Sequence, residues 1–539
     1  MLKFFRKRRT FTMTDAQIKM LIAMVLYMAV VIAIGVYFSK RANKNSNEYF
    51  LGGRSLGPWV SAMSAEASDM SGWLLMGLPG VAYWMGLADA FWTAVGLAAG
   101  TYLNWLIVAK RLRKYSVKVD AITVPDYFSK RFHETDGKKV LLTIASVIIL
   151  IFFSVYAGSC FVACGKLFST LFGLPYIPMM IIGAVFVIIY TFLGGFLAES
   201  ASDFMQAIVM IVALSVILIT GTSAAGGISA VLENAQNIPG FFELFGIATP
   251  VLGENGLQLV ENGAPVFGEA GAYGFITVLS TLSWGLGYFG MPQVLLRFMA
   301  ARKTSEIKMS RRIATVWVII SLFAAVAIGI IGRAMLPTEE ALLSSSGAEN
   351  VFIIICGKLL PPILAGVIMS GILAATISSS DSYLLIAASA FSKNLYQGIF
   401  HKRATDKQVM RCSKIVLVVI AIFGIIVALD ENSVIFNVVS FAWAGFGAAF
   451  GPLMLISLFW KKVTHSAAVA GMLSGGAMVF IWEYVFTPMG KELGISWLTV
   501  YELLPAFLVS TAVIFAVSKF TKAPSEEITA EFDSVAAVE

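Results

Sequence analysis

Long apolar runs alternate with short polar segments along nearly the whole chain, which has 539 residues. An apolar run of about 20 residues is long enough to cross a bilayer as one α-helix. Thirteen such spans are predicted, at about residues 17–39, 58–85, 88–109, 140–168, 177–198, 205–226, 272–297, 313–335, 350–390, 413–429, 434–460, 466–487 and 498–519. The pattern therefore predicts an all-α polytopic membrane protein.

The composition agrees with many membrane spans. Hydrophobic residues make up 58% of the chain, charged residues make up only 13%, and the mean hydropathy is +0.83. These values exclude a soluble globular protein, a disordered chain and a collagen-like fibre. The net charge of +7 does not indicate nucleic-acid binding, because the basic residues cluster between apolar runs, as the positive-inside rule describes.

Charged loops orient the spans. Loops rich in Lys and Arg are expected in the cytoplasm, and acidic loops with few basic residues are expected outside. The basic loops are 110–139, 302–312 and 393–414, and the outside loops are 227–271, 336–349 and 430–433. These signs predict an outside N-terminus and a cytoplasmic C-terminus, although the basic stretch before Thr12 favours the cytoplasm.

This orientation predicts an internal repeat. Spans two to six begin inside and spans seven to eleven begin outside, as two inverted five-helix units require. The predicted divisions are an N-terminal part (1–57), a first five-helix unit (58–226), an acidic outside loop (227–271), a second unit (272–460) and a C-terminal part with two spans (461–539).

The first helix of each unit carries polar, small or helix-breaking residues in the middle of the membrane. Span two reads SAEASDMSGW and span seven reads STLSWGLGYFGMP. Interrupted segments in corresponding places of two repeats indicate the binding site of a transporter. Glu66 and Asp69 are costly in a bilayer unless they are paired, hydrated or close to a cation. The alternative for Asp69 is that it caps a helix fragment.

Span nine carries a dense run of oxygen-bearing side chains between Thr376 and Ser382. A hard cation such as sodium prefers several oxygen ligands. The alternative is that these Ser and Thr residues bond carbonyl groups of their own helix and only allow close helix packing.

Aromatic residues provide a further candidate surface. Trp284 and Tyr288 are four residues apart, so a helix places them on one face. Nearby glycines allow a close approach of the backbone, and Pro292 favours a helix break. Tyr156 is interpreted in the same way, and the alternative for all three aromatics is packing or an interfacial belt.

The remaining intramembrane charges and the absence of catalytic motifs limit the possible functions. Lys166, Asp203 and Arg297 are expected near span ends, from which they reach the interface, and Glu483 has no assigned role. The sequence has no P-loop, no nucleophile elbow, no zinc-protease motif and no CxxC. We therefore expect no enzyme and no cofactor, and either transport driven by an ion gradient or passive transport.

The segments GGRSLGP, ASDMSGWLLMGLPG, WGLGYFGMPQVLLRFMA and GILAATISSSDSYLLIAAS resemble the proline-transporting branch of the sodium:solute symporter family. The resemblance runs from about Asn47 to Pro524. It implies a LeuT-type core of five plus five helices, preceded by one helix and followed by two. It also implies a secondary active transporter that couples sodium influx to L-proline uptake by alternating access.

The resemblance implies roles for particular residues. The sodium ligands would be the carbonyl groups of Ala67, Met70 and Ala375 and the hydroxyl groups of Ser378 and Ser379. The substrate site would comprise Trp73, Tyr156, Trp284, Tyr288 and Pro292, to which Ser68 and Gly285 of the two interrupted spans are added. Coupling would depend on Asp69, Arg54 and Asp203, to which Glu66 is added.

Three features depart from the family pattern. Glu66 stands where a small residue is expected, so strict sodium dependence is open and a proton-coupled variant is an alternative. The acidic loop is longer than expected, and the basic N-terminal stretch is unusual. Other carboxylated solutes, such as pantothenate or another amino acid, remain alternative substrates. The expected location is a bacterial cell membrane, with sodium, proline and lipid as partners and with neither nucleic acid nor an obligate protein partner.

Overall fold

A computed structural model describes residues 13–42, 44–135 and 139–536. The basic stretch before Thr12 lies outside the described residues. The helices of the first half are α1 (Asp15–Ala42), α2 (Ser46–Leu51), α3 (Pro58–Asp69), α4 (Leu78–Met85), α5 (Leu87–Leu103), α6 (Ala109–Lys118), α7 (Val124–Arg131), α8 (Val140–Phe172), α9 (Tyr176–Ala224) and α10 (Ile228–Gln236).

The second half is helical in the same way. Its helices are α11 (Phe275–Leu282), α12 (Pro292–Ala300), α13 (Ile307–Met335), α14 (Ser345–Ala348), α15 (Val351–Leu359), α16 (Pro362–Ser389), α17 (Asp406–Val427), α18 (Ile435–Phe459), α19 (His465–Ile481), α20 (Thr487–Leu493), α21 (Leu503–Phe520) and α22 (Glu526–Ala536). Short 3₁₀ or π-helical turns lie at Gly52–Arg54, Trp73–Gly77, Asn104–Val108, Ser283–Phe289, Thr304–Glu306, Glu340–Leu342, Ala390–Phe400, Trp482–Phe486 and Ser496–Leu498.

Ten helices of the described residues are long and apolar enough to cross a membrane. Three predicted spans contain shorter apolar helices instead, namely Trp73–Met85, Tyr176–Phe192 and Phe275–Phe289. Each of these three spans is interrupted, which explains why a count of uninterrupted helices is smaller than the predicted thirteen.

Two predicted boundaries are wrong. The prediction divides 177–226 near residues 199–204, but α9 is continuous there and departs from helical geometry at Gly195, whose φ is 54°. Glu199 and Asp203 fit inside the helix because both pair with Arg297. The predicted span 350–390 is two helices, α15 and α16, which separate at the Pro361–Pro362 pair, since proline starts helices more readily than it continues them.

The first helix of each predicted five-helix unit is broken in the middle. The helix α3 ends at Asp69, and the chain turns at Met70 (φ −82°, ψ 77°) before it continues into α4. The helix α11 passes into a 3₁₀ turn, Met291 is extended, and α12 begins at Pro292. Both breaks free backbone N–H and C=O groups inside the bundle.

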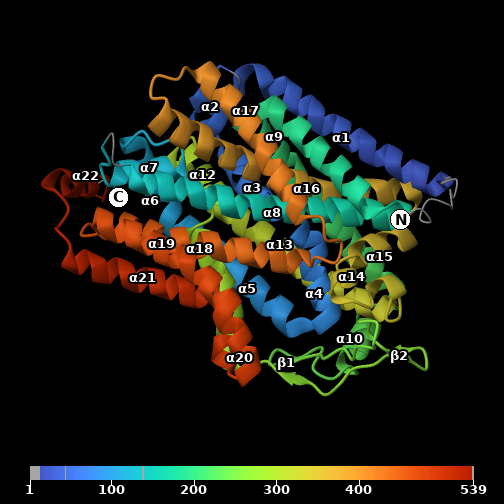
Figure 1. The fold of residues 1–539 in the computed structure, drawn as a ribbon. Helices are drawn as coiled ribbons and strands as arrows, with labels where there is room; N and C mark the ends of the chain where they lie inside the picture. Colours follow the sequence, from blue (N-terminus) through green and yellow to red (C-terminus); the bar gives the residue numbers. More distant parts are fainter. Residues whose placement is uncertain (1–12, 43, 136–138, 537–539) are drawn as a thin grey trace, which may run out of the picture.

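The long helices run roughly side by side, and α16 lies among α1, α8 and α9 (Figure 1). The start of α1 lies at the same end of the bundle as α14 and α15, and α22 lies at the opposite end. The loop 227–271 contains α10 and four short strands, β1 (Gly246–Ile247), β2 (Val260–Glu261), β3 (Ala264–Pro265) and β4 (Gly271–Ala272).

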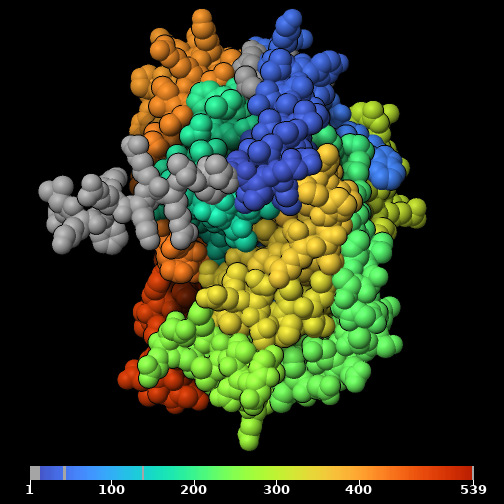
Figure 2. Space-filling model, turned by 90° about the vertical axis from the view of Figure 1, so that its right-hand side faces the viewer, coloured from blue at the N-terminus to red at the C-terminus, as the bar shows by residue number. Residues whose placement is uncertain are grey.

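The strands of this loop form two small antiparallel pairs. Strand β1 pairs with β4, with Gly246 opposite Ala272, and β2 pairs with β3, with Val260 opposite Pro265. Figure 2 shows this loop on the face of the molecule where α1 begins. At the other end, α22 packs on α6, and Glu531 accepts a hydrogen bond from Tyr115 at 2.9 Å.

Candidate functional site

The first part of the site is the contact between the C-terminal end of α3 and the middle of α16. The hydroxyl groups of Ser378 and Ser379 both donate to the carbonyl oxygen of Ala67, at 2.8 and 3.3 Å. Ser378 also lies 3.2 Å from the carbonyl oxygen of Ala375. These residues are fully buried, and Met70 follows at the turn after α3. Four oxygen atoms from two helices therefore lie together, where the family resemblance implies a sodium ion.

The serines of α16 do not all behave alike. Ser380 donates to the carbonyl oxygen of Thr376 at 2.6 Å, and Ser382 donates to that of Ser378 at 2.9 Å. For Ser380 the alternative of bonding within its own helix therefore holds. Ser378 and Ser379 differ because they also reach across to α3.

Asp69 connects this contact to the second broken helix. Its carboxylate accepts hydrogen bonds from the hydroxyl of Tyr288 at 2.7 Å and from the side-chain amide of Gln293 at 3.4 Å. The indole of Trp73 donates to the carbonyl oxygen of Asp69 at 3.2 Å. The turn that begins at Trp73 has no side-chain cap, so the alternative of Asp69 as a helix cap is wrong. The two breaks are instead linked through one carboxylate.

Aromatic rings surround the second break. The rings of Trp73 and Trp284 lie 6.4 Å apart, and Trp284 stacks on Tyr501 at 5.1 Å. The indole of Trp443 donates to the carbonyl oxygen of Trp284 at 2.8 Å, and its ring lies edge-on to Tyr288 at 5.0 Å. The predicted aromatic residues of the two breaks therefore belong to one cluster.

Tyr156 belongs to a neighbouring group that sequence reasoning found only in part. Its ring packs against that of Tyr383 at 4.2 Å. Among the described residues, the hydroxyl groups of Tyr156, Tyr383, Ser71 and Thr376 are buried without a hydrogen-bond partner. Such groups are costly unless a ligand, an ion or water completes them. Tyr383 was not predicted, although it directly follows the oxygen-rich run of α16.

Three predicted substrate residues have other structural explanations. Gly285 lies against α5, where an added Cβ would come within 2.3 Å of the carbonyl oxygen of Gly96. The hydroxyl of Ser68 donates to the carbonyl oxygen of Ala65 at 3.1 Å, within its own helix. Pro292 is the first residue of α12. These positions shape the two broken helices, and their contact with a substrate remains a prediction.

Glu66 faces away from the serines of α16. Its Oε1 atom accepts a hydrogen bond from the indole of Trp105 at 3.2 Å. Its Oε2 atom is buried with no partner among the described residues. The ring of Trp105 packs on Phe298 at 4.4 Å. Glu66 therefore adds a carboxylate next to Trp105, in the Asn104–Val108 turn that follows α5, and not at the Ala67 carbonyl group.

Asp203 and Arg297 do not reach an interface, so that expectation is wrong. Both side chains are fully buried, and Arg297 pairs with Asp203 at 3.1 Å and also with Glu199. Ser64 of α3 donates to Asp203 at 2.7 Å. Since a buried charge needs a partner, α9 and α12 hold one another through this network. Glu199 was missed, although Glu199 and Asp203 form an i, i+4 acidic pair in an apolar span.

Lys166 is also buried and does not reach the interface. Its ammonium lies 2.6 Å from the carboxylate of Glu349 and 2.8 Å from the carbonyl oxygen of Ser433. The other carboxylate oxygen of Glu349 accepts a bond from the backbone N–H of Phe436 at 3.1 Å. This pair joins α8, the α14–α15 segment and the start of α18 at the end of the bundle where α1 begins.

Arg54 joins segments at the opposite end. Its guanidinium donates to the carbonyl oxygens of Met299 at 2.8 Å, Ala121 at 2.6 Å and Ser116 at 3.0 Å. Burial lowers the pKa of Arg54 to about 10, because a charged group loses hydration there. The backbone of Leu56 bonds to that of Ala300 beside it, at 3.2 Å.

The sequence profile of the sodium:solute symporter family matches residues 49–475. The chain belongs to the sodium:solute symporter family. A sodium/proline symporter of Staphylococcus aureus (strain USA300 / TCH1516) is 38% identical over 525 residues, which cover 97% of this chain and 96% of the relative. The symporter of strain JH9 matches to the same extent. These relatives are named as transporters, which confirms the expectation that the chain is not an enzyme.

Solved structures show the same fold. A sodium-coupled sialic acid symporter, solved with substrate in an outward-open state, has a TM-score of 0.74 and 20% identity, over 94% of this chain and 99% of that chain. A nucleobase-cation-symport-1 family transporter has a TM-score of 0.51 and 13% identity, over 90% of this chain and 98% of that one. The predicted LeuT-type fold is therefore confirmed, and members of this symporter family co-transport sodium.

Proposed function

We propose that the chain couples sodium influx to L-proline uptake by alternating access. The observation that carries this proposal is the meeting of the Ala67 carbonyl group with the hydroxyl groups of Ser378 and Ser379. Identity of 38% to sodium/proline symporters over nearly the whole chain supports proline as the substrate. Another small carboxylated solute, such as pantothenate or a different amino acid, is the alternative.

Sodium would bind between α3 and α16. The hydroxyl groups of Ser378 and Ser379 donate to Ala67 in this structure, and on binding they would rotate so that their lone pairs face the ion. The carbonyl groups of Ala67, Met70 and Ala375 would complete an all-oxygen ligand set. The ion would then replace two hydrogen bonds by a stronger link between α3 and α16.

The substrate would bind beside this link, between the two breaks. The carboxylate of proline would meet free N–H groups where a helix is interrupted. Its ring would pack on Trp73, Tyr156 and Trp284, and the unpartnered hydroxyl groups of Ser71 and Tyr383 would complete polar contacts. Asp69 would transmit sodium binding, because it joins the end of α3 to Tyr288.

Two sets of contacts support alternating access. At one end of the bundle, Lys166 and Glu349 hold α8 to the α14–α15 segment. At the other end, Arg54 holds the turn before α3 to α6 and α12. Each set would have to open in turn for a solute to pass.

The proposed topology has thirteen membrane helices in a bacterial cell membrane, with the N-terminus outside and the C-terminus inside. The opposite positions of the start of α1 and of α22 support an odd number of crossings (Figure 1). One charge that moves through 100 mV releases about 2.3 kcal/mol, and a tenfold sodium gradient adds about 1.4 kcal/mol. Together they support an accumulation of roughly 500-fold for a neutral solute.

Equilibrium binding tests the assignment of ion and substrate. Labelled L-proline is added to the purified protein, sodium is titrated against a constant total salt concentration, and unlabelled solutes compete. We expect proline binding that rises with sodium and that only proline or close analogues displace. Displacement by pantothenate but not by proline would contradict the substrate. Binding that is independent of sodium would contradict the coupling ion.

A further inference from the structure

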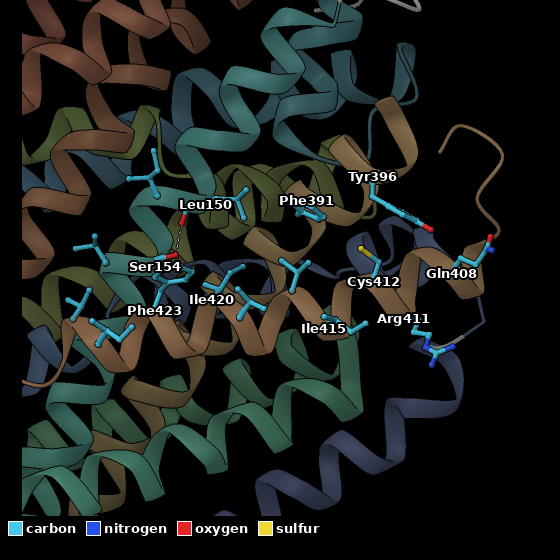
Figure 3. Close-up of a pocket in the computed structure, with 16 residues that line it drawn as sticks. Leu150, Ser154, Phe391, Tyr396, Gln408, Arg411, Cys412, Ile415, Ile420 and Phe423 are labelled. Carbon is cyan, nitrogen blue, oxygen red and sulfur yellow. Dashed lines mark hydrogen bonds between the residues drawn. The ribbon is translucent and has the colours of Figure 1, made fainter. Parts of the chain in front are cut away.

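A long apolar groove runs along α17, on the side away from the proposed transport site. It has a volume of about 1,000 Å³ and lies between α8, α17 and the turn Ala390–Phe400 (Figure 3). This volume is at the upper end of the range of ~300–1,000 Å³ for small-molecule sites. Lining residues on α17 extend from Gln408 to Val427. At 1.5 Å per residue this is roughly 28 Å, which is close to the thickness of the hydrocarbon core.

The groove faces the membrane. Both α8 and α17 are long and apolar enough to span it. On α17 the side chains of Ile415, Phe423 and Ile426 are more than half exposed on the protein surface. The hydroxyl of Ser154, which also lines the groove, donates to the carbonyl oxygen of Leu150 (Figure 3). The hydroxyl of Ser154 is therefore satisfied within α8, and a hydrocarbon chain fits beside it.

Polar groups gather at one end of the groove. Figure 3 shows Gln408, Arg411 and Tyr396 together at this end, and Ser154 and Phe423 at the other. The guanidinium of Arg411 is exposed and makes no hydrogen bond or ion pair with the part of the chain that the structure describes. Arginine stays positively charged in proteins. A ligand with an anionic headgroup and a hydrocarbon chain would match both this charge and the apolar groove.

The segment around Arg411 is also positively charged. Residues 402–414 contain five basic residues and one acidic residue, Asp406. Lys407, Arg411 and Lys414 follow at intervals of four and three, so they share one side of α17. Basic residues beside a membrane attract anionic lipid headgroups, and each contributes roughly a fivefold gain in affinity.

We propose that this groove binds an anionic phospholipid from the leaflet that adjoins residues 402–414. An acyl chain lies between α8 and α17, and the phosphate contacts Arg411, with Gln408 and the hydroxyl of Tyr396 beside it. A guanidinium distinguishes an anionic from a zwitterionic headgroup, because the zwitterion carries its own cation. This site is separate from the proposed sodium and proline site and does not depend on it.

Native mass spectrometry of the whole protein tests its affinity for anionic phospholipid. Phosphatidylglycerol and phosphatidylcholine with identical acyl chains are added to delipidated protein, and the bound fractions are compared. We expect preferential retention of phosphatidylglycerol, and we expect Arg411→Gln to weaken it about fivefold while leaving phosphatidylcholine unchanged. The matched control is Arg312→Gln, since Arg312 is an exposed residue of α13 away from the groove. Equal phosphatidylglycerol affinity in all three proteins would overturn the proposal.

Labelling of Cys412 tests whether the lipid binds in this groove. It lines the groove and is partly exposed, whereas Cys160, Cys164 and Cys356 are buried. We expect phosphatidylglycerol to slow maleimide labelling of Cys412 in the unmodified protein, and to do so less in Arg411→Gln. Labelling that does not respond to phosphatidylglycerol would place the lipid elsewhere and overturn the site. Oxidative formation of a Cys412–Cys412 dimer that phosphatidylglycerol does not suppress would identify a second copy as the occupant, which also overturns it.

Discussion

The two broken helices occupy corresponding places in the two predicted five-helix units, but their surroundings differ. The break after α3 carries Asp69 and Ser71 and faces the serines of α16. The break between α11 and α12 carries no charged side chain. It packs through glycines instead, because an added Cβ on Gly287 would lie 1.9 Å from Trp443, and one on Gly290 would lie 2.3 Å from the carbonyl oxygen of Phe446.

This difference indicates that the two breaks have different roles in binding. Oxygen atoms with buried charge suit a cation, whereas rings and close backbone contacts suit the shape of an organic solute. The hydrogen bond from Tyr288 to Asp69, at 2.7 Å, joins the two. A change at one break should therefore reach the other through this bond.

Asp69→Asn should have the largest effect. The amide removes the negative charge and turns an N–H group toward either Tyr288 or Gln293, both of which donate to Asp69. A hydrogen bond to a charged group contributes about 1.5–3 kcal/mol, so sodium-dependent proline uptake should fall at least about tenfold to 100-fold. Uptake in proteoliposomes measures this. Asp430→Asn, in an exposed loop, serves as the control, and equal uptake by both variants would disprove the link between the breaks.

The double variant Ser378→Ala and Ser379→Ala should have the second-largest effect. The double variant removes two hydroxyl ligands and leaves the carbonyl groups. We expect the sodium concentration for half-maximal uptake to rise by an order of magnitude or more. Ser380→Ala is the matched control, since its hydroxyl bonds within α16. An unchanged sodium dependence of the double variant would remove both serines from the ion site.

Gly287→Ala should disturb the close packing at the second break. The new methyl group would collide with Trp443, and such overpacking costs about 1–3 kcal/mol. Thermal unfolding of the purified protein should occur at a lower temperature than for the unmodified chain. Gly476→Ala is the control, because its added Cβ has only ordinary contacts, the nearest being 3.8 Å from Ala449. Equal destabilisation by both changes would mean that the close contact at Gly287 does not matter.

Glu66→Gly should have the smallest effect on uptake. Glu66 faces Trp105 and not the sodium ligands, so proline uptake should persist while the preference among sodium, lithium and protons changes. Uptake is compared under gradients of each cation. Identical responses of the variant and the unmodified protein would make Glu66 a structural residue without influence on ion choice.

Much of the frame was predictable from sequence, because membrane helices leave long apolar runs and because polar residues inside such runs are rare. The serines of α16 and the break near Asp69 were recognised in this way. The network of Arg297, Glu199 and Asp203 was not, because its partners are more than 90 positions apart and only the packing of α9 against α12 brings them together. The break at Gly195 was missed because the polar residues after it suggested a loop.

Contacts between helices also explain why the local sequence pattern gave an incorrect or incomplete prediction for some residues. Gly285 suggested space for a ligand, but the neighbour that needs the space is Gly96 on α5. Tyr383 had no periodic signal, and its pairing with Tyr156 depends on how α16 lies against α8. Sequence patterns therefore located the elements of the site, and the crossing of those elements decided which side chains meet.

Uphill proline uptake by the reconstituted protein tests the central claim most directly. Liposomes that contain the purified protein receive labelled L-proline with an inward sodium gradient, with equal sodium on both sides, or with an inward proton gradient alone. We predict accumulation above the outside concentration only with the sodium gradient, and collapse of that accumulation when sodium is equilibrated. Accumulation driven only by protons, or no accumulation under any gradient, would contradict sodium–proline symport.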